Sequence, residues 1–276
     1  MLRSGLIGRS ILASRSPWLH EAEARAQGLQ LSYELFDFSA RDLPDAALAN
    51  VINDLVGHGF SGVNVTYPFK QQVIPLLDEM SEGARLIEAV NTIAIRDGRL
   101  IGYNTDMDGF RASVVEGLPG VAMDCVLQLG AGGAGAAVAS ALLSLGVGTL
   151  EITDLDTARL DDLVTRLARQ YGADRVIARR AGDQLTEAID GIVNATPVGL
   201  ASNPGVPIDP DRIGMHHWIA DIVYFPLETE LLRLARAKGC RTLDGSGMVI
   251  NQAAQAFEII TGHAAERSRM RDSFFV

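Results

Sequence analysis

One stretch, residues 126–138, constrains the fold more than any other part of the chain. An apolar run enters a glycine-spaced turn, and the chain leaves that turn as a helical pattern rich in alanine. Gly130, Gly132 and Gly135 fit the pattern G-x-G-x-x-G, in which the glycines allow a tight turn, close approach of a pyrophosphate, and packing of helix on strand. The helix N-terminus also offers unpaired N–H groups to phosphates. The stretch predicts a dinucleotide-binding strand, turn and helix, although small residues also serve ordinary strand–helix packing.

A carboxylate follows at the spacing that this motif requires. Residues 150–154 have the pattern of the next strand, and Asp154 ends it. An acidic side chain roughly 20 residues beyond the glycine turn hydrogen-bonds the adenosine ribose. A 2′-phosphate would meet this negative charge, and Leu155 offers no cation to attract one, so the sequence favours NAD over NADP. The alternative is that Asp154 caps the next helix, but Asp156 is better placed for that role.

Composition excludes several classes of protein. A length of 276 residues suggests roughly two domains. The net charge of −10 leaves no basic stripe, so we expect neither nucleic acid nor an anionic membrane surface as a partner. No apolar run reaches the roughly 18 residues of a membrane-spanning helix. The first residues are too short for a signal peptide, so we expect a cytoplasmic protein, either a monomer or a homodimer.

The cysteines and histidines lack the spacing of a metal site. Cys125 and Cys240 fall on expected buried strands, which favours reduced thiols over a disulfide or a metal pair. The five histidines are scattered, and we expect them to be solvated or locally hydrogen-bonded. The sequence therefore predicts no bound metal.

Short apolar runs alternate with helical patterns in the first hundred residues. Such alternation predicts parallel pairing in an α/β layer. Residues 91–95 and 99–103 flank the turn pair Asp97-Gly98, which predicts a hairpin. The expected strands are 2–8, 32–38 and 62–66, and the expected helices are 17–27, 44–56 and 107–117.

Six further strand-like runs follow, as expected for one doubly wound parallel sheet of the Rossmann type. They lie near 125–129, 149–153, 175–179, 191–195, 218–223 and 240–243. An apolar-periodic helix from residue 248 to 261 is expected to return to the first domain. We therefore expect an α/β protein with a substrate-binding domain of residues 1–106, completed by C-terminal helices within 248–276. The dinucleotide-binding domain would span residues 107–247.

Lysine usage points to one residue. Of 24 lysines and arginines, only Lys70 and Lys238 are lysine. Arginine cannot lose its proton, so a lysine retained at the end of a strand is a candidate base. The pKa of such a lysine would have to fall from ~10.4 toward about 7 to 8 for its amine to act as a base. The alternative for Lys70 is a solvated side chain in a helix's first turn, whereas Lys238 is better explained as a cation at a helix C-terminus.

Polar residues follow other strand ends. Asp106 could share a substrate hydroxyl with Lys70, or it could cap the following helix, and the residues alone leave both possibilities open. Ser16 before Pro17 has the pattern of an N-cap, and hydroxyls beside a helix N-terminus also suit a substrate carboxylate.

Taken together, these motifs resemble the shikimate dehydrogenase family, including its quinate/shikimate branch, almost from end to end. The motifs are Ser14-x-Ser16-Pro17, Asn64-Val65-Thr66-x-Pro68-x-Lys70, Ala89-Val90-Asn91-Thr92, Gly102-x-Asn104-Thr105-Asp106, Gly130 to Gly135, Asn194-Ala195-Thr196-Pro197, Asp221-x-x-Tyr224-x-Pro226 and Gly245-x-Gly247-Met248-x-x-x-Gln252.

The resemblance implies a two-domain enzyme with its active site in the cleft between the domains. Lys70 and Asp106 match the catalytic pair of the family. The implied substrate-binding residues are Ser14, Ser16, Thr66, Asn91, Tyr224 and Gln252. The implied cofactor-binding residues are Gly130, Ala131, Gly132, Gly133, Ala134, Asp154, Thr196, Val223, Gly245 and Met248.

The chain also departs from the family pattern. Asp154-Leu155-Asp156 replaces the Asn-Arg-Thr run of NADP-using members, and Glu21 replaces a frequent asparagine. We therefore expect an NAD-dependent dehydrogenase that interconverts shikimate, or a similar cyclic hydroxy acid, with its 3-dehydro form. Alternatives are a quinate or aminoshikimate dehydrogenase, a catalytically silent paralogue that binds NAD or another ligand, and, from another class, a methyltransferase on a similar sheet.

Overall fold

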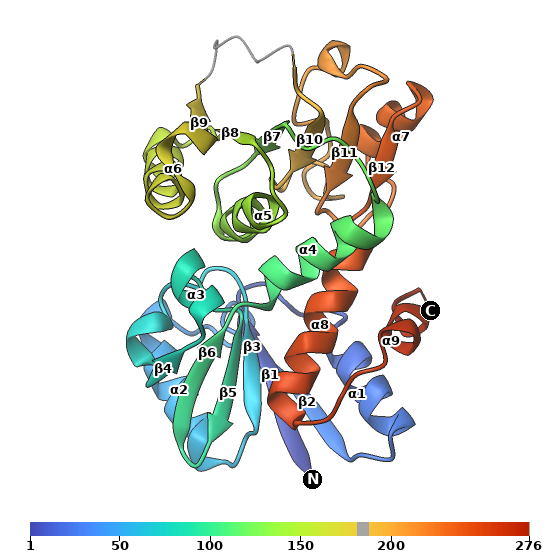
Figure 1. The fold of residues 1–276 in the computed structure, drawn as a ribbon. Helices are drawn as coiled ribbons and strands as arrows, with labels where there is room; N and C mark the ends of the chain where they lie inside the picture. The colour runs from blue at the N-terminus through green and yellow to red at the C-terminus, as the bar shows by residue number, and fades with distance from the viewer. Residues whose placement is uncertain (181–187, 276) are drawn as a thin grey trace. The chain divides into compact units, whose positions relative to one another are not determined.

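The computed structural model describes residues 1–180 and 188–275. They form two compact units, residues 1–105 with 250–276 and residues 106–249 (Figure 1). The strands of the first unit are β1 (Leu2–Gly8), β2 (Leu31–Asp37), β3 (Gly62–Val65), β4 (Glu79–Met80), β5 (Thr92–Arg96) and β6 (Arg99–Tyr103). Its helices are α1 (Ser16–Ala26), η1 (Asp45–Ala47), α2 (Leu48–Gly57), η2 (Ile74–Leu76), α3 (Glu82–Ile87), most of α8 (Ser246–Thr261) and α9 (Arg267–Phe274).

The first unit is built on a mixed sheet. Its strand order is β2-β1-β3-β5-β6-β4, with β1 parallel to β2 and β3, and with β5 antiparallel to β3 and β6. Asp97 and Gly98 both have positive φ, 51° and 78°, as a tight two-residue hairpin turn requires. The predicted hairpin is therefore confirmed.

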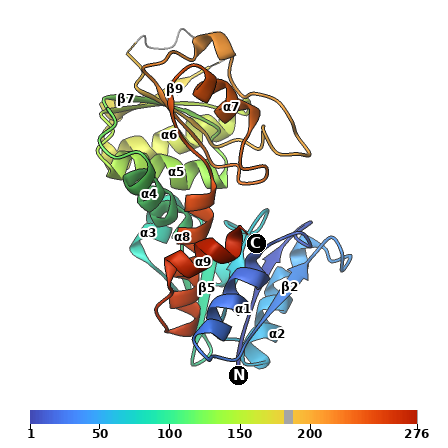
Figure 2. The same ribbon diagram turned by 90° about the vertical axis from the view of Figure 1, so that its right-hand side faces the viewer.

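Helices cover both faces of this mixed sheet. Leu48, Ile52 and Leu55 of α2 pack with buried side chains of β2 and β3. Helices α1, α8 and α9 lie on the opposite face (Figures 1 and 2). There His20 of α1 stacks between Tyr33 of β2 and Phe257 of α8. The N-terminus of α1 and one edge of the sheet, where β1, β3 and β6 end and β5 begins, carry most of the candidate polar residues of this unit.

The second unit has the strand order expected for dinucleotide binding. Its strands are β7 (Cys125–Leu129), β8 (Thr149–Thr153), β9 (Val176–Arg179), β10 (Gly191–Asn194), β11 (Trp218–Asp221) and β12 (Arg241–Leu243). Its helices are α4 (Thr105–Gly117), α5 (Gly133–Ser144), α6 (Thr157–Tyr171), η3 (Ala173–Arg175), η4 (Pro210–Arg212) and α7 (Glu230–Ala237). All five neighbouring pairs are parallel, in the order β12-β11-β10-β7-β8-β9. Counted in chain order within this unit, that is 6-5-4-1-2-3, so the predicted Rossmann-type sheet is confirmed.

Helices α5 and α6 lie side by side on one face of the parallel sheet, and α7 lies on the other (Figures 1 and 2). The core on the α7 side contains Leu127, Ile219 and Leu231, each fully buried. Within the part of the chain that the structure describes, no helix has the length and apolar character needed to cross a bilayer.

Several local expectations were wrong. The helix expected at 44–56 is split into η1 and α2, and β4 and α3 were not predicted. Helix α1 begins at Ser16, so its N-cap is Arg15, and no side chain caps it. Helix α4 begins at Thr105, so Asp106 lies inside its first turn and is not its N-cap.

Both cysteines and His20 are buried. Cys125 and Cys240 are buried free thiols, as expected, although Cys240 lies just before β12. Burial raises the pKa of Cys125 to about 11, which keeps it protonated and inert. His20, in contrast, is only 1% exposed, so the expectation of a solvated ring was wrong there.

Candidate active site

Two serine hydroxyls lie together after β1. The Ser14 hydroxyl donates to the Ser16 hydroxyl at 3.1 Å, and the Ser16 backbone N–H donates to Ser14 Oγ at 3.2 Å. Because Ser16 is the first residue of α1, both hydroxyls stand where the helix offers its unpaired N–H groups. This arrangement suits an anionic group such as a carboxylate.

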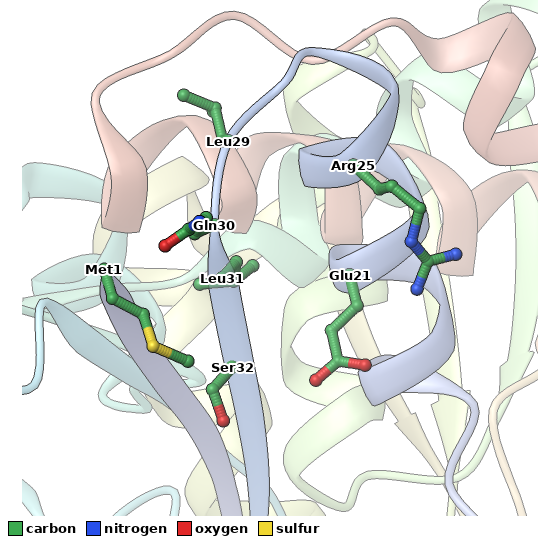
Figure 3. A pocket seen from close by; sticks show the side chains of 7 residues that line it. All are labelled: Met1, Glu21, Arg25, Leu29, Gln30, Leu31 and Ser32. Atoms are coloured by element: carbon green, nitrogen blue, oxygen red, sulfur yellow. The ribbon is translucent and has the colours of Figure 1, made fainter.

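Glu21 fastens the same helix to the edge of the sheet. Its carboxylate accepts the backbone N–H of Tyr33 at 2.9 Å. Glu21 and Arg25 also line an open hollow of about 420 Å³ beside β2 (Figure 3). None of the candidate site residues lines this hollow, so it gives no support to a binding site there.

Lys70 lies in the turn that follows β3. The Thr66 backbone N–H donates to the Ile7 carbonyl at 2.9 Å, and the fully buried Phe69 anchors the turn. The Lys70 carbonyl accepts the backbone N–H of Val90 at 2.8 Å, which ties the lysine to the segment that leads into Asn91. Lys70 is half-buried and belongs to no helix, so the alternative of a helix's first turn was wrong.

A largely buried chain of amides and hydroxyls lies along one edge of the sheet in the first unit, where β3 and β6 end and β5 begins. Asn91 Nδ2 donates to Thr105 Oγ1 at 3.0 Å, and the Thr105 hydroxyl donates to Gln252 Oε1 at 3.4 Å. Asn64 Nδ2 donates to Thr92 Oγ1 at 3.0 Å, and Thr92 in turn donates to Asn91 Oδ1 at 3.1 Å. These neutral donors and acceptors can bind hydroxyl groups of a ligand.

Tyr33 extends this chain and was not predicted. Its hydroxyl donates to Asn64 Oδ1 at 2.8 Å, and burial raises the pKa of its phenol even though a hydrogen bond with Ser16 lowers it. Tyr33 stands in the middle of a strand, so only its partners from other elements reveal its place beside Ser16 and Asn64.

The glycine turn of the second unit has the predicted geometry. Gly130 has φ 103°, and a Cβ there would lie 2.6 Å from the Ala195 carbonyl oxygen. A Cβ on Gly135 would lie 2.4 Å from the Gly130 carbonyl oxygen. A Cβ on Gly132 or Gly133 would meet nothing within 4 Å. The turn is thus tight on the protein side and open at the helix start, which fits close approach of a pyrophosphate.

Asp154 is fixed beside this turn. Asp154 Oδ2 accepts the Ala131 backbone N–H at 2.6 Å, and its Oδ1 accepts the Asp156 backbone N–H at 2.8 Å. Asp156 caps α6 by accepting the Arg159 backbone N–H at 3.1 Å, so the expectation that Asp156, and not Asp154, caps this helix is confirmed. Leu155, fully exposed, offers no charge.

Asp106 and Tyr224 are related electrostatically within the second unit. Asp106 is only 7% exposed. Partial burial, followed by the negative charge of Asp106, raises the pKa of the Tyr224 phenol. Tyr224 therefore stays protonated and can donate a hydrogen bond near this carboxylate.

The remaining candidate residues lie at the carboxyl ends of β10 and β11 and at the start of α8. Thr196 donates through its hydroxyl to Asn194 Oδ1 at 2.7 Å. A Cβ on Gly245 would lie 2.5 Å from the Ile222 carbonyl oxygen, so only glycine fits there. Met248 is buried in the first turn of α8.

The predicted residues are divided between the two units. Ser14, Ser16, Thr66, Lys70, Asn91 and Gln252 belong to the first unit. Asp106, Tyr224 and the candidate cofactor-binding residues belong to the second. No group of three or more histidine, cysteine, aspartate or glutamate side chains that could hold a metal ion occurs in the described parts of the chain.

A parallel sheet with an open glycine turn, joined in one chain to a second α/β unit rich in buried hydroxyls and amides, defines a two-domain dinucleotide-binding protein. A family model for the shikimate dehydrogenase substrate binding domain matches residues 6–93, and one for the shikimate 5′-dehydrogenase C-terminal domain matches residues 245–273. A shikimate dehydrogenase (NADP(+)) of Pseudarthrobacter chlorophenolicus is 47% identical over 272 residues, which cover 98% of this chain and 93% of that protein. The chain belongs to the shikimate dehydrogenase family.

Other relatives are named with NAD instead of NADP. A quinate/shikimate dehydrogenase (NAD(+)) of Corynebacterium efficiens is 45% identical over 273 residues, which cover 98% of this chain and 96% of that protein. The structure of quinate dehydrogenase from Corynebacterium glutamicum in complex with NAD superimposes with a TM-score of 0.93 at 43% identity, covering 99% of this chain and 98% of that one. The chain is therefore an oxidoreductase that acts on a hydroxyl group, in a family that uses NAD or NADP.

Proposed function

We propose that the chain interconverts shikimate, or a close analogue such as quinate, with its 3-dehydro form by hydride transfer, using NAD. The observation that carries the proposal is the buried chain of hydroxyls and amides through Asn91, Thr105 and Gln252. Such groups recognise a substrate rich in hydroxyls, because a substrate lacking one leaves a buried partner unpaired. The relatives named above supply the substrate class.

In this proposal, each unit has a separate task. The first unit binds the acid: Ser14 and Ser16 hold its carboxylate at the start of α1, and Thr66, Asn91 and Gln252 hold its ring hydroxyls. The second unit binds the dinucleotide, with the pyrophosphate beside residues 131–134 and on the N–H groups of residues 132–134, because the Ala131 N–H donates to Asp154. Thr196, Val223, Gly245 and Met248 line the nicotinamide end, and Tyr224 contacts the substrate.

Lys70 and Asp106 perform the proton transfer. One of the two takes the proton of the substrate hydroxyl while the hydride leaves the same carbon, so that the alcohol becomes a ketone. The nicotinamide of a bound NAD would supply the hydride acceptor. The other member of the pair keeps the hydroxyl in place by a hydrogen bond. A general acid–base role of this kind contributes roughly 10² to 10⁴-fold to the rate.

Asp154 supports the choice of NAD. Its carboxylate is held by two backbone N–H groups beside the glycine turn, and the spacing of the glycine motif assigns the adenosine ribose to such a carboxylate. A 2′-phosphate at that position would meet a fixed negative charge. Arg159 lies 3.8 Å from Asp154 and is also close to Asp156, so its charge is shared between two carboxylates.

A single assay design tests the proposal. Reduced nicotinamide formation is followed by absorbance with NAD or NADP and with shikimate, quinate or aminoshikimate. We expect turnover with NAD and shikimate, and a loss of roughly 100-fold or more in Lys70→Ala. Lys238→Ala is the matched control, since this second lysine of the chain binds the carbonyls of Pro210 and Ile213 near the end of α7.

Each outcome bears on a different part of the proposal. Equal rates for Lys70→Ala and the wild type would remove Lys70 from the reaction. A clear preference for NADP would overturn the role given to Asp154. Faster turnover of quinate or aminoshikimate would make that acid the substrate. Binding of NAD without turnover of any of the three acids would favour the silent paralogue.

A further inference from the structure

Asp221 is a buried carboxylate that the proposed function does not use. It is the last residue of β11, it is 2% exposed, and it pairs in register with Asn194, the last residue of β10. Two loops leave the sheet at this point, residues 195–199 after β10 and residues 222–229 after β11. The end of a parallel strand is where open α/β sheets bind their ligands.

Asp221 accepts three hydrogen bonds, one from Asn194 at the end of β10 and two from the loop after β11. Its Oδ1 accepts Asn194 Nδ2 at 2.9 Å and the Val223 backbone N–H at 3.0 Å. Its Oδ2 accepts the Thr229 hydroxyl at 2.7 Å. The carboxylate therefore holds the beginning and the end of the loop after β11.

Asn194 carries the connection into the other loop. Its Nδ2 also donates to the Val198 carbonyl at 2.9 Å, and its Oδ1 accepts the Thr196 backbone N–H at 3.0 Å and the Thr196 hydroxyl at 2.7 Å. The side-chain oxygen and the side-chain nitrogen of Asn194 are thus both used to shape residues 195–198. Asp221 and Asn194 together form one hydrogen-bonded centre for the two loops.

The charge of Asp221 costs stability. Its three hydrogen bonds come from neutral donors, and burial outweighs them, so the pKa of Asp221 is raised. A carboxyl group whose pKa is higher in the folded protein favours folding when protonated and loses that contribution as the pH rises through this pKa. In its ionised form the group therefore opposes folding. If the only task at this position were to join two strands, a neutral side chain would be cheaper to bury.

We infer that Asp221 is a positioning residue of the active site, whose ionised carboxylate fixes both loops so that Thr196, Val223 and Tyr224 are correctly placed. The inference rests on the proposed function, which assigns the first two residues to the cofactor and Tyr224 to the substrate. Hydrogen bonds to an ionised acceptor are roughly twice as strong as neutral ones, so the charge holds the loops more firmly than an amide would. Tyr224 follows Val223 directly, and Asp106 influences its phenol.

The test is Asp221→Asn, which keeps the shape of the side chain and removes the charge. We expect a melting temperature no lower than that of the wild type, because the desolvation cost disappears. We expect kcat/KM to fall roughly tenfold, as for the loss of about 1.4 kcal/mol of hydrogen bonding, with most of the change in the KM for the dinucleotide. Glu230→Gln, at an exposed carboxylate on α7, is the control and leaves both quantities unchanged.

A second pair of variants tests the hydrogen bond from Thr229, whose hydroxyl also caps α7. Thr229→Val removes the donor to Asp221 Oδ2, whereas Thr229→Ser keeps it. We expect Thr229→Val to raise the KM for the dinucleotide and Thr229→Ser to restore it. A kcat/KM of Asp221→Asn within twofold of the wild type would overturn the inference. So would a lower melting temperature with activity lost only in proportion to the unfolded fraction.

Binding of NADH, measured by calorimetry, makes the test independent of the acid. If wild type turns over none of the acids, the proposed function fails, yet the dissociation constant of NADH still reports on Asp221. Weaker binding in Asp221→Asn then supports the inference, and equal binding overturns it.

Discussion

Acidification should destabilise the first unit through one side chain, His20. The His20 side chain is 1% exposed. The centroid of its ring lies 4.7 Å from the ring centroid of Tyr33 and 6.1 Å from the ring centroid of Phe257. Its Nδ1 has no hydrogen-bond partner among the residues that the structure describes. Burial therefore lowers the pKa of His20 from 6.5 to about 4, and the folded protein keeps the ring neutral.

The sign and size of the effect follow from this difference. The unfolded chain binds the proton more tightly than the folded one, so protonation favours unfolding. The contribution of the neutral ring is present above about pH 6.5 and is lost as the pH falls toward about 4. The whole difference corresponds to about 3 kcal/mol, of which about 2 kcal/mol is lost between about pH 7 and about pH 5.

The variant His20→Leu isolates this contribution, because leucine has a similar volume and does not titrate. Urea unfolding is followed by circular dichroism for both proteins at about pH 7, 6 and 5. We expect the wild type to lose about 2 kcal/mol more than His20→Leu over this range. His58→Gln, at an exposed ring, serves as the control. A difference between wild type and His20→Leu that stays constant within about 0.5 kcal/mol would refute the reasoning.

Three other predictions each test the contacts of one side chain. Asp37→Asn should destabilise the protein by about 1–3 kcal/mol. Burial alone would raise the pKa of Asp37, but four backbone N–H groups donate to its carboxylate and lower that pKa. Thermal unfolding measures the loss, and an unchanged melting temperature would contradict this prediction. Arg269→Met should lower the free energy of unfolding by about 2 kcal/mol more than Glu23→Gln does. The reason is that Arg269→Met leaves the buried Glu23 carboxylate without its cation. Equal losses of stability for the two variants in urea unfolding would contradict this prediction. Gln128→Met should weaken NADH binding about tenfold and leave the KM for the acid unchanged. The Gln128 amide donates to the carbonyls of Gly130 and Gly135, both at 2.8 Å, and so holds the glycine turn in shape. Calorimetry measures the affinity for NADH, and an unchanged affinity would exclude this role of Gln128.

Much of the fold could be predicted because its signals are local. Strand and helix periodicities, the Asp97-Gly98 turn and the glycine turn after β7 depend on residues that are neighbours along the chain. These patterns placed all but one of the strands and the main helices. They failed where local evidence is weak: β4 has two residues, and α3 has six. At α1 the serine and proline were identified correctly, but the start of the helix was placed one residue too late.

The candidate site could be predicted only where it follows a motif. Lys70, Asp106 and the glycines stand in short runs whose residue types and spacing are informative. Tyr33, Gln128 and Asp221 were not among the predicted site residues. Two of them have some local signal: Gln128 is a polar residue in an otherwise apolar strand, and Asp221 belongs to a family motif. Their partners, Asn64 for Tyr33 and Asn194 and Thr229 for Asp221, come from other elements.

The sequence by itself determined the order of the elements, the two α/β units and the chemistry of the glycine turn, because backbone conformation and burial pattern are properties of short segments. Only the tertiary structure decided that His20 is sealed between aromatic rings and that Asp221 is buried with neutral partners. The physical reason is that desolvation and hydrogen bonding depend on which distant segments meet, and one segment does not contain that information.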